Sequence, residues 1–381
     1  MYKILALNKI SSIGTDCLPK DQYEILSEEA NPVGILLRSY DMHEMELPDS
    51  LLAAARAGAG VNNVPLDKCA DKGVVVFNTP GANANAVKEL VIWGLLSASR
   101  KVVQGIKWAE TLKGKDDVEK LVEKGKGDYV GPEILGKTIG IIGLGAIGAL
   151  VAHAATALGM KVVGYDPFLS PEAAAKLPEV KIINDIPAVL AESDYVSLHL
   201  PLNKETKYLF NEEMLNNAKD GLKVLNFARG ELVCNTGIKK CLESGKVSCY
   251  VIDFPNGEVL DHENIIAIPH LGASTPESEE NCAYMAANQL KEYLENGNII
   301  NSVNYPNCEL PCTGNKRICV LSKKACPDAL KAAITDAGHT VTGSIAKERG
   351  AYAYAIFEVD GDVKDLSAVE KVEGVVKVRA I

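Results

Sequence analysis

The sequence predicts an α/β protein of two or three domains, and three observations favour this class. Short apolar runs alternate with helical stretches over residues 1–97, and a glycine-rich loop links an apolar run to a helix near residue 143. Residues 316–381 alternate in the order βαββαβ. A chain of 381 residues is long enough for this organisation at about 150 residues per domain.

The composition is that of a globular protein, with 47% hydrophobic and 24% charged residues. The net charge is −10 and no basic run occurs, so we expect no binding to nucleic acid. No stretch approaches the ~18 apolar residues of a membrane span, so we expect no membrane partner. Ten cysteines without a secretory signal indicate reduced thiols and a cytoplasmic location.

Four of the cysteines fall close together, at Cys308, Cys312, Cys319 and Cys326. Their spacings of four, seven and seven do not form the paired CxxC pattern of common zinc sites. We therefore expect packing or surface thiols here and no metal site.

The first α/β layer is predicted from the strand-like runs KILAL, VGILLR and VVVFN. From Ala86 to about Lys113, apolar residues recur at intervals of three and four, which predicts a long helix crossing between two domains. The polar, glycine- and lysine-rich stretch that follows predicts a connection before the next fold unit.

The strongest signal is the loop GLGAIG, residues 143–148, between the strand-like run TIGII and a helical run. Gly143 permits a tight turn, Gly145 lets a pyrophosphate approach the backbone, and Gly148 lets the helix pack close to the strand. Asp166 ends the second strand, where a carboxylate binds ribose hydroxyls and repels a 2′-phosphate, so NAD is favoured over NADP. A glycine turn without a ligand fits the same letters, but strand, helix and Asp166 in register favour a dinucleotide site.

Further strands are predicted at DYVSLHL, LKVLNFA, SCYVIDF and NIIAIP, giving a doubly wound parallel sheet of the Rossmann type. Ligands of such sheets bind beyond the carboxyl ends of the strands. Leu200, Ala228, Asp253 and His270 occupy those ends and should share one cleft.

Three polar residues after the glycine loop suit the oxidation of a 2-hydroxy acid. Arg229 can hold a carboxylate bidentately, His270 can exchange a proton, and Glu258 can orient the imidazole and raise its basicity. Taken singly, each also fits a plain alternative, a surface ion pair for Arg229 or a structural histidine for His270. Their joint occurrence after a dinucleotide loop favours catalysis.

GLGAIG with YDP, then NFARG, DFPNGE and PHLGAST, in this order, resemble the D-isomer-specific 2-hydroxyacid dehydrogenase family over residues 1–305. The resemblance implies a flavodoxin-like substrate domain built from residues 1–97 and 283–305. An NAD-binding Rossmann domain, residues 98–282, would be inserted between these segments.

The resemblance also implies roles for individual residues. Arg229 would bind the substrate carboxylate and carbonyl, Glu258 would support the histidine, and His270 would exchange the proton of the C2 hydroxyl. The expected NAD contacts come from the glycine loop and the strand ends. They are Thr79, Gly143, Gly145, Ala146, Ile147, Gly148, Asp166, Leu200, Phe227, Ala228, Asp253 and Gly272.

Within the family, the stretches LLRSY, ARAGAGVNNV and VFNTPGANANAVKELV are most similar to members that oxidise 3-phosphoglycerate at the entry to serine synthesis. Ala59 and Gly60 would then approach the substrate, with Arg56 and Arg38 available for its phosphate. Solvent-exposed ion pairs are the alternative for both arginines.

Two other functions stay open. One is the same chemistry on an unphosphorylated acid such as glycerate or lactate, and the other is a dinucleotide-sensing binding protein of the corepressor type. Four positions depart from the family's usual pattern and leave the substrate less certain than the reaction class: Asn62, Ala146, Cys234 and Asn235.

After a linker at residues 306–315, the βαββαβ order of residues 316–381 predicts a ferredoxin-like domain that resembles a regulatory ACT domain. That resemblance implies L-serine as an effector, although Asp328 stands where such domains often carry glycine. A purely oligomerising role is the alternative. The family suggests a homodimer or a homotetramer.

Overall fold

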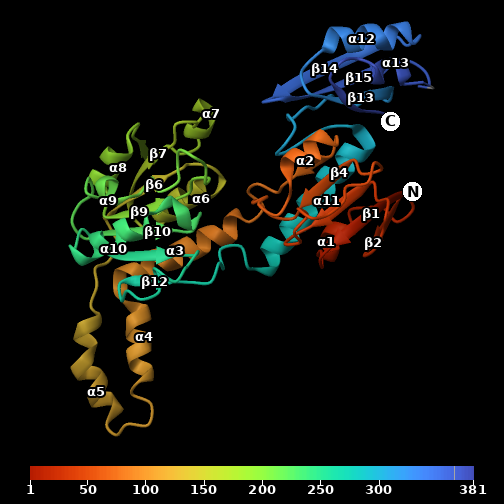
Figure 1. The fold of residues 1–381 in the computed structure, drawn as a ribbon. Helices are drawn as coiled ribbons and strands as arrows, with labels where there is room; N and C mark the ends of the chain where they lie inside the picture. The colour runs from red at the N-terminus through yellow and green to blue at the C-terminus, as the bar shows by residue number, and fades with distance from the viewer. Residues whose placement is uncertain (364) are drawn as a thin grey trace. The chain divides into compact units, whose positions relative to one another are not determined.

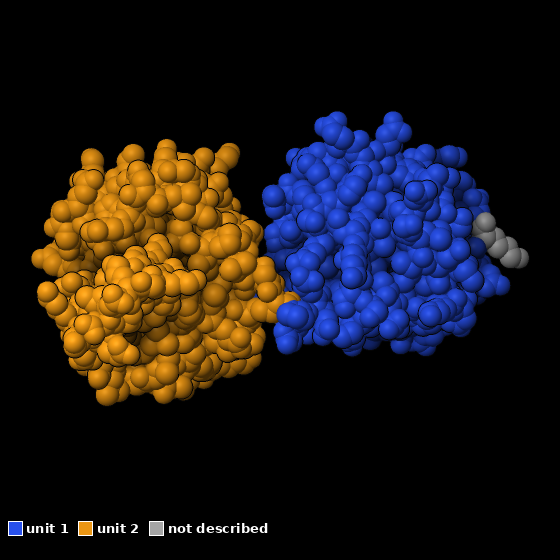
Figure 2. All heavy atoms as spheres, turned by 90° about the horizontal axis from the view of Figure 1, so that it is seen from below, with its two compact units in different colours: residues 1–83, 276–381 blue, residues 84–275 orange. Residues whose placement is uncertain are grey.

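The computed structural model describes every residue of the chain except residue 364. It divides into two compact units, residues 84–275 and residues 1–83 with 276–381 (Figure 2). The unit boundaries lie earlier than the expected boundaries after residues 97 and 282. Helix α3 (Ala84–Arg100) belongs wholly to the second unit, because its Val91 and Leu95 are buried in that unit's core.

The unit of residues 84–275 contains a seven-stranded sheet in the order β12-β11-β10-β9-β6-β7-β8 (Figure 1). All of its strand pairs are parallel. The strand order reverses between β6 and β9, as the doubly wound fold requires, and the predicted Rossmann topology is confirmed. The strands are β6 (Thr138–Ile142), β7 (Lys161–Tyr165), β8 (Val180–Ile182), β9 (Tyr195–Leu198), β10 (Leu222–Asn226), β11 (Val247–Ile252) and β12 (Ile265–Ala267).

Both faces of this sheet are buried. Neighbouring residues such as Ile141 and Ile142 point to opposite faces and enter two different hydrophobic clusters. The connecting helices are α6 (Ala146–Ala157), α7 (Pro171–Ala174), α8 (Ile186–Glu192), α9 (Glu212–Leu215) and α10 (Asn235–Glu243), and a short 3-10 turn η2 spans Gly230–Leu232.

A helical arm extends from this unit. The helix expected from Ala86 to Lys113 is interrupted, because Lys101 adopts a left-handed φ of 47° and separates α3 from α4 (Val102–Glu110). Helix α5 (Val118–Gly125) and the turn η1 (Lys126–Tyr129) complete the arm, which projects away from the sheet (Figure 1). No residue of α4 or α5, both fully described, is buried.

The other unit begins with a five-stranded parallel sheet in the order β2-β1-β3-β4-β5. This is the predicted flavodoxin-like order. Its elements are β1 (Tyr2–Leu7), α1 (Ser12–Thr15), β2 (Tyr23–Leu26), β3 (Gly34–Leu37), β4 (Ala53–Arg56), α2 (Leu66–Asp71) and β5 (Val75–Phe77). Helix α11 (Pro276–Asn296) returns to this sheet and buries Ala286, Ala287 and Leu290 in its core.

The C-terminal part of the same unit is a four-stranded antiparallel sheet in the order β14-β15-β13-β16. The chain order β13 (Lys316–Ser322), α12 (Pro327–Asp336), β14 (Val341–Arg349), β15 (Tyr352–Val359), α13 (Ser367–Glu370) and β16 (Val375–Ala380) is βαββαβ. The predicted ferredoxin-like fold is therefore confirmed.

This small sheet is covered on both faces. Ile318 and Val320 pack under α12, whereas the alternate residues Cys319 and Leu321 enter the core that contains α11. The C-terminal sheet therefore docks on the flavodoxin-like layer of the same chain.

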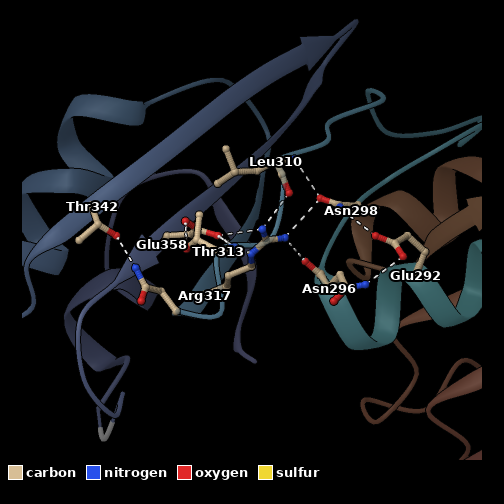
Figure 3. Close-up of polar contacts among 9 residues, drawn as sticks. Glu292, Asn296, Asn298, Leu310, Thr313, Arg317, Thr342 and Glu358 are labelled. Atoms are coloured by element: carbon tan, nitrogen blue, oxygen red, sulfur yellow. Dashed lines mark hydrogen bonds and ion pairs between the residues drawn. The ribbon is translucent and has the colours of Figure 1, made fainter.

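A buried ion pair lies at this junction. The Arg317 guanidinium contacts Glu358 at 2.9 Å, with side-chain exposures of 2% and 4%. Arg317 also donates to the backbone oxygens of Asn296 and Leu310, and Thr313 donates to Glu358 (Figure 3). These contacts give the buried charges hydrogen-bond partners. Since Asn296 ends α11, they also join the C-terminal sheet to the end of that helix.

Two of the four clustered cysteines, Cys308 and Cys319, are buried in this core, and Cys312 is exposed. Among the described residues, no helix is both long and apolar enough to cross a membrane.

Candidate active site

The glycine loop has the geometry that its sequence predicts. Gly143 adopts a φ of 95°, and a Cβ at Gly148 would lie 1.9 Å from the Gly143 carbonyl oxygen. A Cβ at Gly145 would meet nothing within 4 Å, so the space above the loop is open. Ala146 begins α6 beside this space, and no side chain of the described residues caps the helix. The free N–H groups of the first turn therefore suit a diphosphate.

Asp166 closes the loop from the end of β7. One carboxylate oxygen accepts the Leu144 N–H and the other accepts the Phe168 N–H, both at 2.9 Å. The side chain is only partly buried. Asp166 thus shapes the glycine loop and also places a negative charge where an NAD ribose is expected.

Three expected cofactor contacts lie along the neighbouring strand ends. Leu200 is partly buried, and its side chain lies beside Gly143. The Phe227 ring is buried against α3 at Gly94, which leaves the backbone of Phe227 for any cofactor contact. The Ala228 N–H donates to the side-chain oxygen of Asn226.

Sequence reasoning missed Asn226. It is fully buried, and its amide also donates to the Arg229 carbonyl oxygen at 2.9 Å. Asn226 therefore fixes the turn that presents Arg229. The available signal was a polar residue ending the apolar strand LKVLN.

Asp253 holds the loop that carries His270. Its carboxylate accepts the Leu271 N–H at 2.6 Å and the Gly272 N–H at 2.8 Å, and the residue is 1% exposed. Burial raises the pKa of the Asp253 carboxyl, and the two N–H groups only partly offset this effect. A Cβ at Gly272 would lie 2.8 Å from the Asp253 carboxylate, so this close approach requires glycine.

His270 and Arg229 reach the same aromatic ring. The His270 ring lies 4.4 Å from the Phe254 ring centroid, and the Arg229 guanidinium carbon lies 5.5 Å from that centroid. Phe254 directly follows Asp253 and was also missed from the sequence. The structure thus brings the expected imidazole and guanidinium to one place at the carboxyl ends of β10, β11 and β12.

Glu258 does not pair with His270 in this structure. Its carboxylate accepts the Asn235 side-chain amide at 2.8 Å, and within the described part of the chain no hydrogen bond joins it to His270. Asn235 begins α10, and Glu258 is exposed. The expected imidazole–carboxylate contact therefore requires Glu258 to leave Asn235.

Four expected substrate residues lie at the carboxyl ends of β3 and β4. Arg56 donates from Nε to the Arg38 carbonyl oxygen at 3.0 Å and from Nη1 to the Gly60 carbonyl oxygen. The Ala59 carbonyl accepts the Asn78 side-chain amide. These Arg56 donors therefore hold the loop that was expected to meet the substrate.

Arg38 forms an ion pair with Glu279 of α11 at 2.8 Å, and both side chains are nearly half exposed. The Asn8 side-chain oxygen accepts the N–H groups of Arg38, Ser39 and Tyr40, which fixes the backbone of this loop. Asn8 and Glu279 were missed because neither stands in a recognisable motif.

Thr79 follows β5 and is fully buried. Its N–H donates to the Gly58 carbonyl oxygen, but its hydroxyl has no hydrogen-bond partner among the described residues. Buried polar groups are normally hydrogen-bonded, so this hydroxyl is suited to bond with a ligand. The unpartnered hydroxyl is compatible with the expected role of Thr79 as an NAD contact.

The chain is similar to known proteins over most of its length. Residues 92–272 match the family model for the NAD-binding domain of the D-isomer-specific 2-hydroxyacid dehydrogenases. A hydroxypyruvate reductase from Thermotoga maritima is 37% identical over 244 residues, covering 62% of this chain and 75% of the relative. The chain belongs to the D-isomer-specific 2-hydroxyacid dehydrogenase family. It therefore carries the family's NAD-binding domain.

The similar proteins carry the names of different enzymes. A D-3-phosphoglycerate dehydrogenase from Rattus norvegicus is 34% identical over 290 residues, which cover 74% of this chain and 52% of the relative. The chain thus spans about half the length of this relative. The solved structure of an NAD⁺-bound 3-phosphoglycerate dehydrogenase from Entamoeba histolytica is similar, with a TM-score of 0.62 and 26% identity. That match covers 80% of this chain and 98% of the solved one.

Proposed function

We propose that the chain is an NAD-dependent dehydrogenase that oxidises 3-phosphoglycerate to 3-phosphohydroxypyruvate. The observation that supports the chemistry best is the meeting of His270 and Arg229 at Phe254, on the same sheet edge as the glycine loop. An imidazole and a guanidinium beside a dinucleotide site supply the base and the carboxylate clamp that a 2-hydroxy acid needs.

The glycine loop from Gly143 to Gly148 and Asp166 would hold NAD, which would supply the hydride acceptor for C2 of the substrate. His270 takes the proton of the C2 hydroxyl as the carbonyl forms, and in the reverse direction its imidazolium returns that proton. Arg229 holds the carboxylate and polarises the forming carbonyl oxygen. Glu258 turns from Asn235 to His270 and stabilises the positive charge that the imidazole gains.

The substrate assignment rests on the arginines and on the relatives. Arg38 directly follows β3 and Arg56 ends the adjacent strand β4. A relative named D-3-phosphoglycerate dehydrogenase aligns over most of this chain. A substrate phosphate would replace Glu279 as the partner of Arg38, because an exposed ion pair stabilises by only about 0–1 kcal/mol.

One observation favours a second candidate, an unphosphorylated acid such as D-glycerate. Arg38 is already paired with Glu279, and Nε and Nη1 of Arg56 donate to backbone carbonyl oxygens. The relative named hydroxypyruvate reductase is consistent with this reading. Competition between 3-phosphoglycerate and D-glycerate as substrates separates the two candidates.

The catalytic roles are tested with His270→Gln, with Arg100→Gln, an exposed arginine of α3, as the matched control. His270→Gln should lower kcat by roughly 100- to 10,000-fold, the usual contribution of a general base. NADH binding, followed by fluorescence, should persist. Full turnover by His270→Gln would refute the proposed role of His270 as the base.

We also propose that the C-terminal domain binds L-serine as an effector, with oligomerisation as its alternative role. Asp328 lies in the first turn of α12, where its charge favours the helix N-terminus but disfavours a ligand carboxylate. Serine should therefore inhibit weakly, and Asp328→Gly should strengthen the inhibition. Initial rates with a serine titration measure both effects.

We infer a homodimer or a homotetramer as the assembly. Exposed apolar side chains on α3 and α4 support this, with Leu96 43%, Val102 47% and Ile106 55% exposed. Light scattering coupled to size exclusion should give a multiple of 40.7 kDa, and Ile106→Asp should shift it towards the monomer.

A further inference from the structure

Phe254 connects side chains from three neighbouring strand ends. Arg229 follows β10, Phe254 follows β11, and His270 follows β12, and β11 lies between the other two strands. We infer that Phe254 is a positioning residue that sets the direction of the His270 imidazole and of the Arg229 guanidinium during turnover. This inference rests on the proposed dehydrogenase function.

The His270 imidazole depends on this contact. Its backbone is held in a left-handed conformation, with a φ of 53° and its N–H bonded to the Ile268 carbonyl oxygen. Across the described residues its side chain makes no hydrogen bond, and Phe254 is its aromatic neighbour, with the ring planes tilted by 45°. The imidazole is otherwise exposed, so its packing on the Phe254 ring favours one rotamer over the others.

The same ring also steers Arg229. The guanidinium carbon lies over the Phe254 ring, and Nη1 donates to the Ala228 carbonyl oxygen at 2.6 Å. A guanidinium on an aromatic face keeps its planar N–H edge available for a carboxylate. Phe254 therefore restricts the rotamers of the Arg229 side chain, and the N–H edge of the guanidinium stays accessible to a substrate carboxylate.

Phe254 is itself well held. It is half-buried against the core of the unit, and a Cβ at Gly230 would lie 3.3 Å from its Cβ. The preceding residue, Asp253, grips Leu271 and Gly272 through their N–H groups. Adjacent residues thus fix the His270 loop in two ways, Asp253 through the backbone and Phe254 through the imidazole.

The test compares Phe254→Leu, which keeps apolar bulk but removes the ring, with Phe254→Tyr, which restores it. Leu260→Ala is the control, because Leu260 lies on the same segment and is 64% exposed. Each variant is assayed for kcat, for KM of NAD and for NADH affinity by fluorescence. Phe254→Leu should lower kcat roughly 10- to 100-fold, as a small misplacement of a reacting group does. Both NADH affinity and the thermal midpoint should stay near wild type, and Phe254→Tyr should recover most of the rate.

A second readout does not require turnover. The chain has only six histidines, so few imidazole proton signals are expected in the NMR spectrum. The signals of His270 are those that disappear in His270→Gln. The Phe254 ring current should shift these signals in the wild type and in Phe254→Tyr, and the shift should vanish in Phe254→Leu.

Two results would overturn the inference. The first is a kcat within twofold of wild type in Phe254→Leu. The second is a loss of kcat matched by equal losses of NADH affinity and thermal midpoint, which marks a merely structural residue. A wild-type protein without turnover on any 2-hydroxy acid, but with the ring-current shift present, would instead count against the proposed function.

Discussion

The Asp166 carboxylate accepts a hydrogen bond from the Leu144 N–H at 2.9 Å, so the residue expected to select the cofactor also shapes the loop that binds it. Asp166→Ala removes the acceptor and the negative charge together. We expect KM for NAD to rise roughly 10- to 100-fold, which corresponds to about 1.5–3 kcal/mol for a charge-assisted hydrogen bond. The ratio of NADP to NAD turnover should rise as well. Steady-state rates with both cofactors measure this, and the exposed Glu243→Gln serves as the control.

Gly272→Ala should abolish most of the activity. Its Cβ would lie 2.8 Å from the Asp253 carboxylate, closer than a carbon–oxygen contact allows, so the His270 loop must shift. We expect kcat to fall roughly 100-fold. Gly257→Ala is the matched control, because a Cβ there would meet nothing within 4 Å. Equal activity of the two variants would show that the Asp253 contact does not position the loop.

Glu358 should make stability depend on pH. Burial raises the pKa of its carboxyl, but Arg317 and Thr313 more than offset this, so the folded-state pKa is lowered. The ionised form therefore contributes stability above the unfolded pKa of about 4.3, and this contribution is lost as the pH falls through the lower folded value.

Glu358→Gln should consequently destabilise the protein at pH 7 by about 3–5 kcal/mol, because it leaves Arg317 buried without its partner charge. The difference from wild type should shrink as the pH falls below about 4. Thermal unfolding followed by circular dichroism at several pH values measures this, with the exposed Glu348→Gln as the control. A difference that is constant with pH would contradict the linkage.

Glu279→Gln tests whether Arg38 binds the phosphate of the substrate. Removing the charge frees Arg38 from its ion pair, so KM for 3-phosphoglycerate should fall up to about fivefold, the range of an exposed pair. KM for D-glycerate should not change. Glu277→Gln, an exposed change in the same helical turn, is the control. A fall in KM for both acids would place Arg38 near the carboxylate rather than near the phosphate.

Much of the fold was predictable, because it depends on local patterns. The glycine loop, the apolar strands and the βαββαβ order each follow from short-range periodicity and turn residues. The break at Lys101 was not predictable, since the apolar spacing continues through it and only the backbone conformation shows the interruption. The position at which the second compact unit begins was not predictable either, because a helix pattern does not reveal which sheet will bury its apolar face.

The candidate site was predictable only in part. Arg229 and His270 stand in motifs at strand ends, and the structure brings them together. The partner of Glu258 is set by side-chain geometry between distant segments, which a linear pattern does not encode. The same limit applies to Phe254 and Asn226, whose roles arise from contacts across neighbouring strands.

The central claim is tested most directly by NADH formation from 3-phosphoglycerate, D-glycerate and D-lactate at alkaline pH, with the 2-oxo acid trapped by hydrazine. The account predicts NADH formation with 3-phosphoglycerate, at a kcat/KM well above those of the two unphosphorylated acids. Equal or faster turnover of D-glycerate would retain the chemistry but contradict the phosphate assignment. No NADH from any of the three acids would contradict the proposed dehydrogenase function itself.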